Sequence, residues 1–172
     1  SMVKDEVITG WFHQYSDEIY NFLIYRVGEA DVDDLVQEVF IRAMNGFEQF
    51  KGESEPKTWL YSIARNIAID EIRRRNRKKW KSLISLETSH EPSSDITPEQ
   101  ILGLKEENRQ MYEAIQSLKP SYRDVIILRG IRGLSVKSTS DILGWTEKKT
   151  RLTYYRAKLA LQKRLGGVSY EK

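Results

Sequence analysis

The sequence predicts an all-α protein of two small helical domains, residues 3–81 and 105–166, joined by a flexible linker over residues 82–104. In both domains apolar residues recur at steps of three and four, which is the spacing of an amphipathic helix. The linker lacks this periodicity and is rich in Ser, Thr, Pro and acidic residues, a composition typical of a tether. Neither a strand pattern nor an internal repeat occurs, so the predicted fold class rests on helices alone.

Three helices are predicted in the N-terminal domain (residues 3–81). The first carries apolar residues at helical spacing from Ile8 to Leu23. Asp31 is predicted to cap the second helix, and Gly46 to stop it. After a polar loop, Pro56 suits the first turn of the third helix, where its missing N–H is not needed.

A polar and aromatic stripe on the third helix leads into a basic block. At 100° per residue the stripe spans about 80° of the helix surface. Its members are Trp59, Ser62, Asn66, Asp70 and Arg73. The block is RRRNRKKWK, residues 73–81, with seven basic residues in nine and no acid. Aromatic and amide groups can meet bases while cations hold phosphates, so this face suits a nucleic-acid strand.

The C-terminal domain (residues 105–166) contains the pattern of a helix-turn-helix. Ser135 is a candidate N-cap for a short helix, Gly144 can take the left-handed conformation that ends it, and Thr146 can cap a second helix. The second helix of such a motif enters the DNA major groove. Its basic residues favour this use, although a helical hairpin with a solvated basic face is the alternative.

The net charge of +3 conceals alternating blocks of charge. Residues 145–164 hold seven basic residues against Glu147 alone, and residues 87–107 hold six acids against Lys105 alone. Basic surfaces separated by an acidic stretch indicate two sites for a polyanion. A solvated helix face remains the alternative for each run of charge.

The residue types needed for several chemistries are missing or wrongly spaced. The absence of cysteine removes disulfides, thiolate metal sites and cysteine nucleophiles, and fits a reducing cytoplasm. His13 and His90 lack metal-ligand spacing, and the acids at 31–34 are the sole metal candidate, so we predict no catalytic residue, metal or cofactor. No apolar run approaches the roughly 20 residues of a transmembrane helix, and we expect a soluble protein without a signal peptide.

Two stretches of the chain resemble the extracytoplasmic-function (group IV) branch of the sigma-70 family, the promoter-specificity subunits of bacterial RNA polymerase. The strings DDLVQEVF and WLYSIARNIAIDEIRRR are similar to sigma region 2, and LKPSYRDVIILRGIRGLSVKSTSDILGWTEKKTRLTYYRAK is similar to sigma region 4. The resemblance covers roughly residues 8 to 165, in the order of the family. It implies a region 2 helical bundle followed by a linker and a region 4 helix-turn-helix.

The resemblance implies two roles for the N-terminal domain. The second helix would bind the β′ clamp helices of core polymerase, through Asp34, Gln37, Glu38, Ile41 and Arg42. The following loop and third helix would trap and hold the melted −10 element, through Lys51, Ser54, Lys57, Trp59, Asn66, Asp70, Arg73 and Arg74. For Trp59 a place in the core is an equal alternative, and the acids at 31–34 are also explained by the positive end of the helix.

The C-terminal domain would read the −35 element as duplex DNA. The expected contacts are Lys148, Lys149, Arg151, Leu152, Tyr155, Arg156 and Lys158. The chain departs from the family at Thr153, where arginine is usual, at Thr150 and Ser140, where small or aliphatic residues are usual, and at Trp145, which is often isoleucine. The departures put in question the −35 sequence that is read and the packing of the motif.

Further partners follow from the resemblance. These are core polymerase, including its β flap, promoter DNA, and an anti-sigma factor of the kind that is often membrane-anchored; we expect a monomer when the protein is free. A stand-alone helix-turn-helix regulator is the alternative, but such proteins are typically dimers that read two half-sites, and no heptad seam is present. An enzyme acting on nucleic acid is the least favoured hypothesis.

Overall fold

A computed structural model describes residues 2–50, 52, 54–85 and 106–166 of the chain. Within these ranges all the secondary-structure elements are helical. The all-α prediction is therefore confirmed. The elements of the N-terminal domain are α1 (Met2–Val27), α2 (Val32–Asn45), the 3-10 turn η1 (Phe47–Gln49) and α3 (Pro56–Ile84). Those of the C-terminal domain are α4 (Glu106–Gln116), α5 (Pro120–Val125), the π-helical segment η3 (Ile126–Ile131), α6 (Val136–Leu143) and α7 (Glu147–Arg164).

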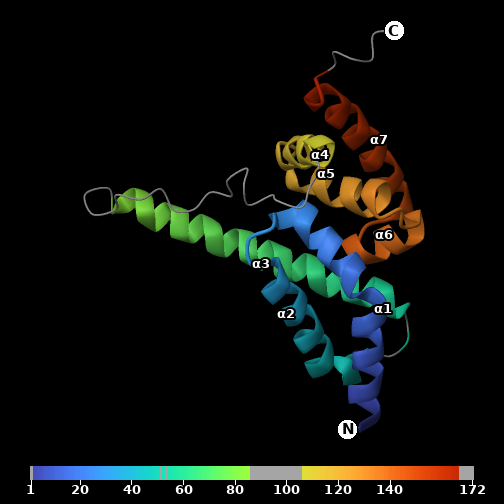
Figure 1. The fold of residues 1–172 in the computed structure, drawn as a ribbon. Helices are drawn as coiled ribbons and strands as arrows, with labels where there is room; N and C mark the ends of the chain where they lie inside the picture. The colour runs from blue at the N-terminus through green and yellow to red at the C-terminus, as the bar shows by residue number, and fades with distance from the viewer. Residues whose placement is uncertain (1, 51, 53, 86–105, 167–172) are drawn as a thin grey trace.

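The N-terminal domain is a bundle in which α1, α2 and α3 all contact one another. Its centre is apolar, with Phe22, Val39 and Tyr61 fully buried. Figure 1 shows α2 on one side of α1 and α3, and α4 to α7 gathered on the other side. The outward face of α2 is consequently not covered by the C-terminal domain.

The ends of the N-terminal helices agree with the sequence except at two places. Pro56 opens α3 as predicted. Asp31 does stand at the N-cap of α2, but it adopts a left-handed φ of 60° and its side chain makes no capping hydrogen bond, so the predicted cap is wrong. Residues 82–84, which we expected in the linker, form the last turn of α3, while residues 86–105 lie outside the described ranges.

The helix-turn-helix of the C-terminal domain is built by the predicted caps. The Ser135 side chain accepts from the Ser138 N–H, and the Thr146 side chain accepts from the Lys149 N–H. Between them Gly144 has a φ of 69°, a conformation that glycine adopts without a steric penalty. Ser135 and Gly144 fix where α6 begins and ends, and Thr146 fixes where α7 begins.

The two domains pack directly against each other, and the centre of their interface is a buried ion cluster. Asp124 of α5 accepts a hydrogen bond from Arg26 Nε of α1 at 2.8 Å and another from Arg65 Nε of α3 at 2.9 Å. The Asp124 and Arg26 side chains are each 3% exposed. We call these three residues the Asp124 clasp, and the packing that it holds the closed arrangement.

Several other contacts across this interface are polar, and they lie beside buried apolar residues of the two domains that belong to one hydrophobic cluster. Arg132, just after η3, donates to the Tyr61 hydroxyl at 3.2 Å and to Asn21 Oδ1 at 3.0 Å, and Gln116 donates to the Tyr25 carbonyl. Burial raises the pKa of Tyr61, so its hydroxyl stays protonated and can donate to Glu18. Polar interfaces between domains can separate in water, because each group regains hydrogen bonds with solvent.

Candidate nucleic-acid interface

The predicted −35 contacts form one exposed face of α7. All seven residues of this set are exposed, and Leu152 and Tyr155 are 44% and 59% exposed despite being apolar or aromatic. Arg151 makes an ion pair with Glu147 at 3.3 Å, one turn earlier. The face therefore offers exposed cations and two large side chains, a combination that can meet phosphates and base edges.

Aromatic rings hold two of these cations against the helix surface. Lys149 Nζ lies 4.6 Å from the centre of the Trp145 ring, and Lys158 Nζ lies 4.5 Å from that of Tyr154. Arg129 approaches the same Tyr154 ring. Tyr154 was not among the predicted site residues; it is half-buried and bears on the site through the cations that it holds.

The departures at Ser140 and Thr150 have a structural explanation. The two side chains are buried and their hydroxyl oxygens lie 2.7 Å apart, joining α6 to α7. Each oxygen also lies within hydrogen-bonding distance of a carbonyl, Val136 O for Ser140 and Thr146 O for Thr150. Two hydroxyl protons can serve only two of these three contacts at a time. Each hydroxyl oxygen nevertheless has a hydrogen-bond partner, so polar residues are accommodated at these two buried positions. Thr153 is half-buried, and nothing in the structure explains its replacement of arginine.

Removing both hydroxyls is expected to cost less stability than the two single losses together. Thr150→Val should lower the free energy of unfolding by about 1 kcal/mol, since it deletes one side chain-side chain hydrogen bond. Ser140→Ala should act similarly, and the double variant should show a coupling of about 0.5–1.5 kcal/mol. Urea unfolding of the four proteins measures this, and strict additivity would show that the hydroxyls do not interact.

Some of the predicted −10 contacts are exposed and others are half-buried. Asn66, Asp70, Arg73 and Arg74 are exposed along α3. Three of the five residues of the predicted stripe are therefore exposed, whereas Trp59 and Ser62 are half-buried. Lys57 and Ser54 are half-buried at the start of the helix, where Lys57 lies 3.9 Å from Glu18. Lys51 lies outside the described residues.

Trp59 belongs to an aromatic cluster beneath the loop that precedes α3. Its ring stacks on Phe50 at 4.9 Å and meets Trp11 edge-on at 6.1 Å, and Trp11 also meets Phe47 at 5.8 Å. Trp59 is half-buried as a result. Trp59 therefore packs against the start of this loop, and only the exposed part of its ring can contact DNA.

Glu71, which is not among the predicted site residues, organises the arginines that follow the stripe. Its side chain is 7% exposed and accepts from Arg74 at 2.7 and 2.8 Å and from Arg75 at 2.7 Å. The hydrogen bonds from Arg74, and then those from Arg75, hold the pKa of Glu71 below its usual value. Arg75 in turn donates to the carbonyls of Val27 and Ala30, which fixes the turn between α1 and α2.

The predicted polymerase contacts lie on the uncovered face of α2. Asp34, Gln37, Ile41 and Arg42 are exposed, Ile41 by 53%, and Glu38 is half-buried. Arg42 bonds Glu38 at 3.1 Å and reaches Asp70 of α3 at 3.4 Å. This bond places the predicted polymerase face next to the predicted −10 face.

The described residues also bear on two other kinds of site. They contain no group of three or more His, Asp or Glu side chains arranged to hold a metal ion. In the same ranges no helix is long and apolar enough to cross a membrane.

Comparisons with known families and proteins match both domains. Residues 11–78 match the model for Sigma-70 region 2, and residues 108–161 match that for Sigma-70 region 4. The chain is 34% identical over 157 residues to the ECF RNA polymerase sigma factor SigX of Bacillus subtilis, covering 90% of this chain and 81% of SigX. It is 33% identical over 165 residues to the RNA polymerase sigma factor YlaC of the same organism, covering 95% of each.

Two solved structures with a similar fold are both of complexes, and one of them contains a sigma factor. The sigma factor RpoE of Bartonella quintana, bound to the anti-sigma factor NepR, superposes with a TM-score of 0.72 at 25% identity, covering 94% of this chain and 97% of that one. CnrH, bound to the cytosolic domain of CnrY, superposes with a TM-score of 0.71 at 21% identity, over 96% and 91% of the two chains, which shows a shared fold.

Proposed function

Because this chain belongs to the extracytoplasmic-function branch of the sigma-70 family of RNA polymerase sigma factors, we propose how its surfaces select a promoter. The C-terminal domain reads the −35 element as duplex, and the N-terminal domain captures the −10 element as it melts. The observation that carries this assignment is the exposure of both predicted faces, on α7 and α3, while their supporting residues are buried. The protein performs no chemical step itself, because binding energy alone offsets the few kcal/mol of unstacking.

On α7 the residues divide by the kind of contact they can make. Arg151, Arg156 and Tyr155 are placed to reach base edges, since an arginine fork fits guanine and an aromatic ring fits a thymine methyl group. Lys148, Lys149 and Lys158 act on phosphates as point charges. Leu152 adds an apolar contact within the groove.

On α3 and the loop before it, exposed groups receive the opened strand. Asn66 and Asp70 offer hydrogen bonds to unstacked bases, and Arg73 and Arg74 hold the backbone. Lys51, Ser54 and Lys57 border the base that leaves the stack, and Trp59 supports the start of the loop through its stacking on Phe50. Charge, amide and aromatic groups thus follow one another along the path of the strand.

The exposed face of α2 docks on core polymerase. The contacts are Asp34, Gln37, Glu38, Ile41 and Arg42, directed to the β′ clamp helices, while the C-terminal domain meets the β flap. Since the structural relatives RpoE and CnrH were solved with NepR and CnrY, the former an anti-sigma factor, an inhibitor of this class is a further partner of this chain. The protein acts as a monomer, in the cytoplasm, where polymerase and DNA are found.

Promoter binding requires the two domains to separate. Arg73 of the −10 surface and Lys149 of the −35 surface line one pocket of about 480 Å³ in the closed arrangement. The two promoter elements are roughly 25 base pairs, or roughly 85 Å, apart in B-DNA at ~3.4 Å per base pair. Both surfaces cannot be engaged at that distance while they share one pocket, so the closed arrangement is the form without promoter.

Run-off transcription with core polymerase and a promoter library tests the proposed function. We expect transcripts that start downstream of a common pair of −35 and −10 elements, and none without the protein. A stable dimer that binds a palindrome without polymerase and supports no initiation would instead identify a stand-alone regulator.

Arg156→Ala is expected to weaken binding of the −35 duplex by about 1–3 kcal/mol and to relax the preference at one base pair, because an arginine fork discriminates between bases. Lys158→Ala, two residues along α7, should weaken all sequences alike and lower the salt dependence. Titrations with single-base variants of the duplex distinguish the two. A uniform loss for Arg156→Ala would assign it to a phosphate instead.

A further inference from the structure

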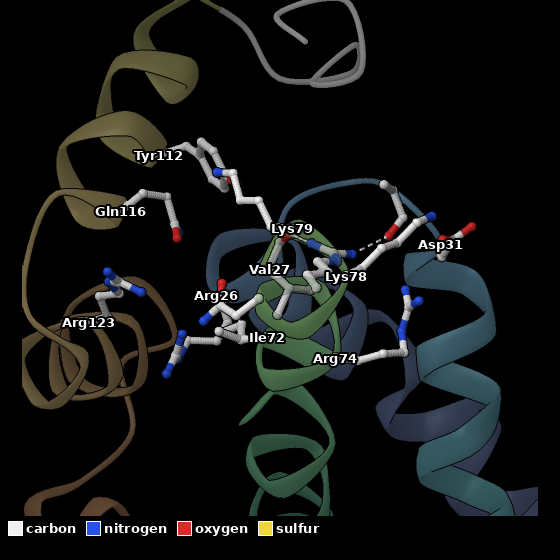
Figure 2. Close-up of a pocket in the computed structure, with 13 residues that line it drawn as sticks. Arg26, Val27, Asp31, Ile72, Arg74, Lys78, Lys79, Tyr112, Gln116 and Arg123 are labelled. Atoms are coloured by element: carbon white, nitrogen blue, oxygen red, sulfur yellow. Dashed lines mark hydrogen bonds between the residues drawn. The ribbon is translucent and has the colours of Figure 1, made fainter. Parts of the chain in front are cut away.

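A second pocket at the domain interface is unusually basic. It has a volume of about 330 Å³ and lies between the end of α1, the middle of α3 and helices α4 and α5 (Figure 2). Its cationic lining residues are Arg26, Arg74, Arg75, Lys78, Lys79 and Arg123. Asp31 is the single acid among the residues that line it. The pocket therefore gathers positive charge from both domains around one concavity.

The carboxylates nearby compensate only part of this charge. Glu71 is shared between Arg74 and Arg75, and Asp124 is shared between Arg26 and Arg65. Arg123 gives its Nε hydrogen bond to the Leu118 carbonyl, which carries no charge. Burial, and then the positive charge of Arg26, lowers the pKa of Arg123, so the two guanidinium groups disfavour each other. An anion in the pocket would relieve this repulsion.

One of the residues that line the pocket has a buried donor without a partner. The Arg26 guanidinium uses its Nε for Asp124, and among the described residues no acceptor lies within hydrogen-bonding distance of its buried Nη1. Arg26 is 3% exposed and lines both this pocket and the pocket of about 480 Å³ that Asp124 and Arg65 also line. A buried, unpaired N–H of a charged group is costly, and it is rare in native structures unless a ligand or ion completes it.

We propose that this pocket binds a small anion carrying two or more phosphate groups, held by Arg26 and Lys78 of the N-terminal domain and Arg123 of the C-terminal domain. Guanidinium forks match phosphate oxygens in pairs, and several cations around one cavity select multivalent anions over single carboxylates. The volume lies at the lower end of the range for small-molecule sites.

Because the anion touches both domains, it stabilises the closed arrangement over the open one in proportion to its occupancy. It would therefore keep the −10 and −35 surfaces from binding promoter DNA. This consequence rests on the proposed function, whereas binding and closure do not.

Calorimetric titration of the whole chain with tripolyphosphate and with ATP, both without divalent cation, tests the site. We expect one anion per chain, and about tenfold weaker binding for Lys78→Gln and for Arg123→Gln, since each removes one charge-assisted contact. Lys81→Gln is the matched control, because Lys81 is an exposed lysine of the same helix outside the pocket lining. Lys78 is also exposed, so its variant keeps the test valid if Arg123→Gln does not fold.

Closure is read separately from two dyes on cysteines introduced at Asn45 and Lys163, both exposed, in a chain that has no cysteine of its own. The anion should raise energy transfer in the wild-type background and leave it unchanged with Lys78→Gln. Tighter binding of ATP than of tripolyphosphate would identify a nucleotide as the source of the phosphates, and the reverse an inorganic chain. No binding of either anion, or equal losses for Lys78→Gln and Lys81→Gln, would overturn the site even if the protein initiates transcription.

Discussion

Asp124→Ala is expected to open the closed arrangement, because it removes the acceptor of Arg26 and that of Arg65 at once. Arg26 is 3% exposed, so alanine leaves its charge buried without a carboxylate. Breaking a buried ion pair in this way costs about 3–5 kcal/mol. For two states in equilibrium this is a factor of roughly a hundred to a few thousand in favour of the open form.

The cost falls on the packing of the two domains rather than on the fold of either one. The hydrogen bonds that the Asp124 carboxylate accepts come from α1 and α3, both in the N-terminal domain. When the domains separate, Arg26 and Arg65 return to water and the penalty disappears. At limiting concentration the variant should therefore start transcription with core polymerase more readily than the wild type.

Energy transfer between dyes on the cysteines introduced at Asn45 and Lys163 measures the opening, and it should fall in Asp124→Ala. Asp141→Ala is the matched control, since that aspartate lies on α6 in an exposed pair with Lys137 at 3.6 Å. Unchanged energy transfer combined with a lower free energy of unfolding would show that the clasp serves the fold of one domain and not the closed arrangement.

Local features of the fold could be predicted because their causes lie within a few residues. The caps at Ser135 and Thr146 and the left-handed Gly144 depend on neighbours three residues away or on the glycine itself. Pro56 opens α3 for the same kind of reason. Asp31 shows the limit of such arguments, because its backbone takes the left-handed form and its side chain makes no capping bond.

The contacts that hold the domains together could not be predicted in this way. Asp124 lies 98 positions from Arg26 and 59 from Arg65, and in the sequence it has the pattern of an ordinary helical acid. Glu71 sits between two exposed stretches of charge, yet it is buried by the arginines it binds. Helical spacing assigns a residue to a face, but it does not show whether a charge on that face is buried or which distant residue it pairs with.

For the candidate surfaces, helical spacing predicted which residues share an exposed face where a single helix carries all of those residues. The α7 residues and the Asn66 to Arg74 part of α3 are exposed on continuous faces, as their spacing predicts. It was less informative for Trp59, whose surroundings come from α1 and from the loop before α3. An aromatic residue next to a functional stripe needs the tertiary structure to separate support from contact.

Trp59→Ala is expected to reduce both stability and capture of the melted −10 strand, whereas Asn66→Ala should reduce capture alone. The tryptophan stacks on Phe50 at 4.9 Å and meets Trp11 at 6.1 Å, so truncation leaves a void under the loop before α3. Loss of a large, partly buried aromatic side chain costs about 2–4 kcal/mol. Asn66 is exposed, so its removal should leave the free energy of unfolding within about 0.5 kcal/mol.

Urea unfolding and reactivity of unpaired thymines in the promoter complex give the two readouts, and binding of the −35 duplex by both variants should match the wild type. Trp59→Phe decides what the tryptophan does. A phenylalanine keeps an aromatic surface against Phe50 and Trp11, so we expect it to regain most of the stability and, with the loop supported, most of the strand capture. Regained stability without regained capture would contradict the supporting role and assign the exposed edge of Trp59 to a base of the −10 element.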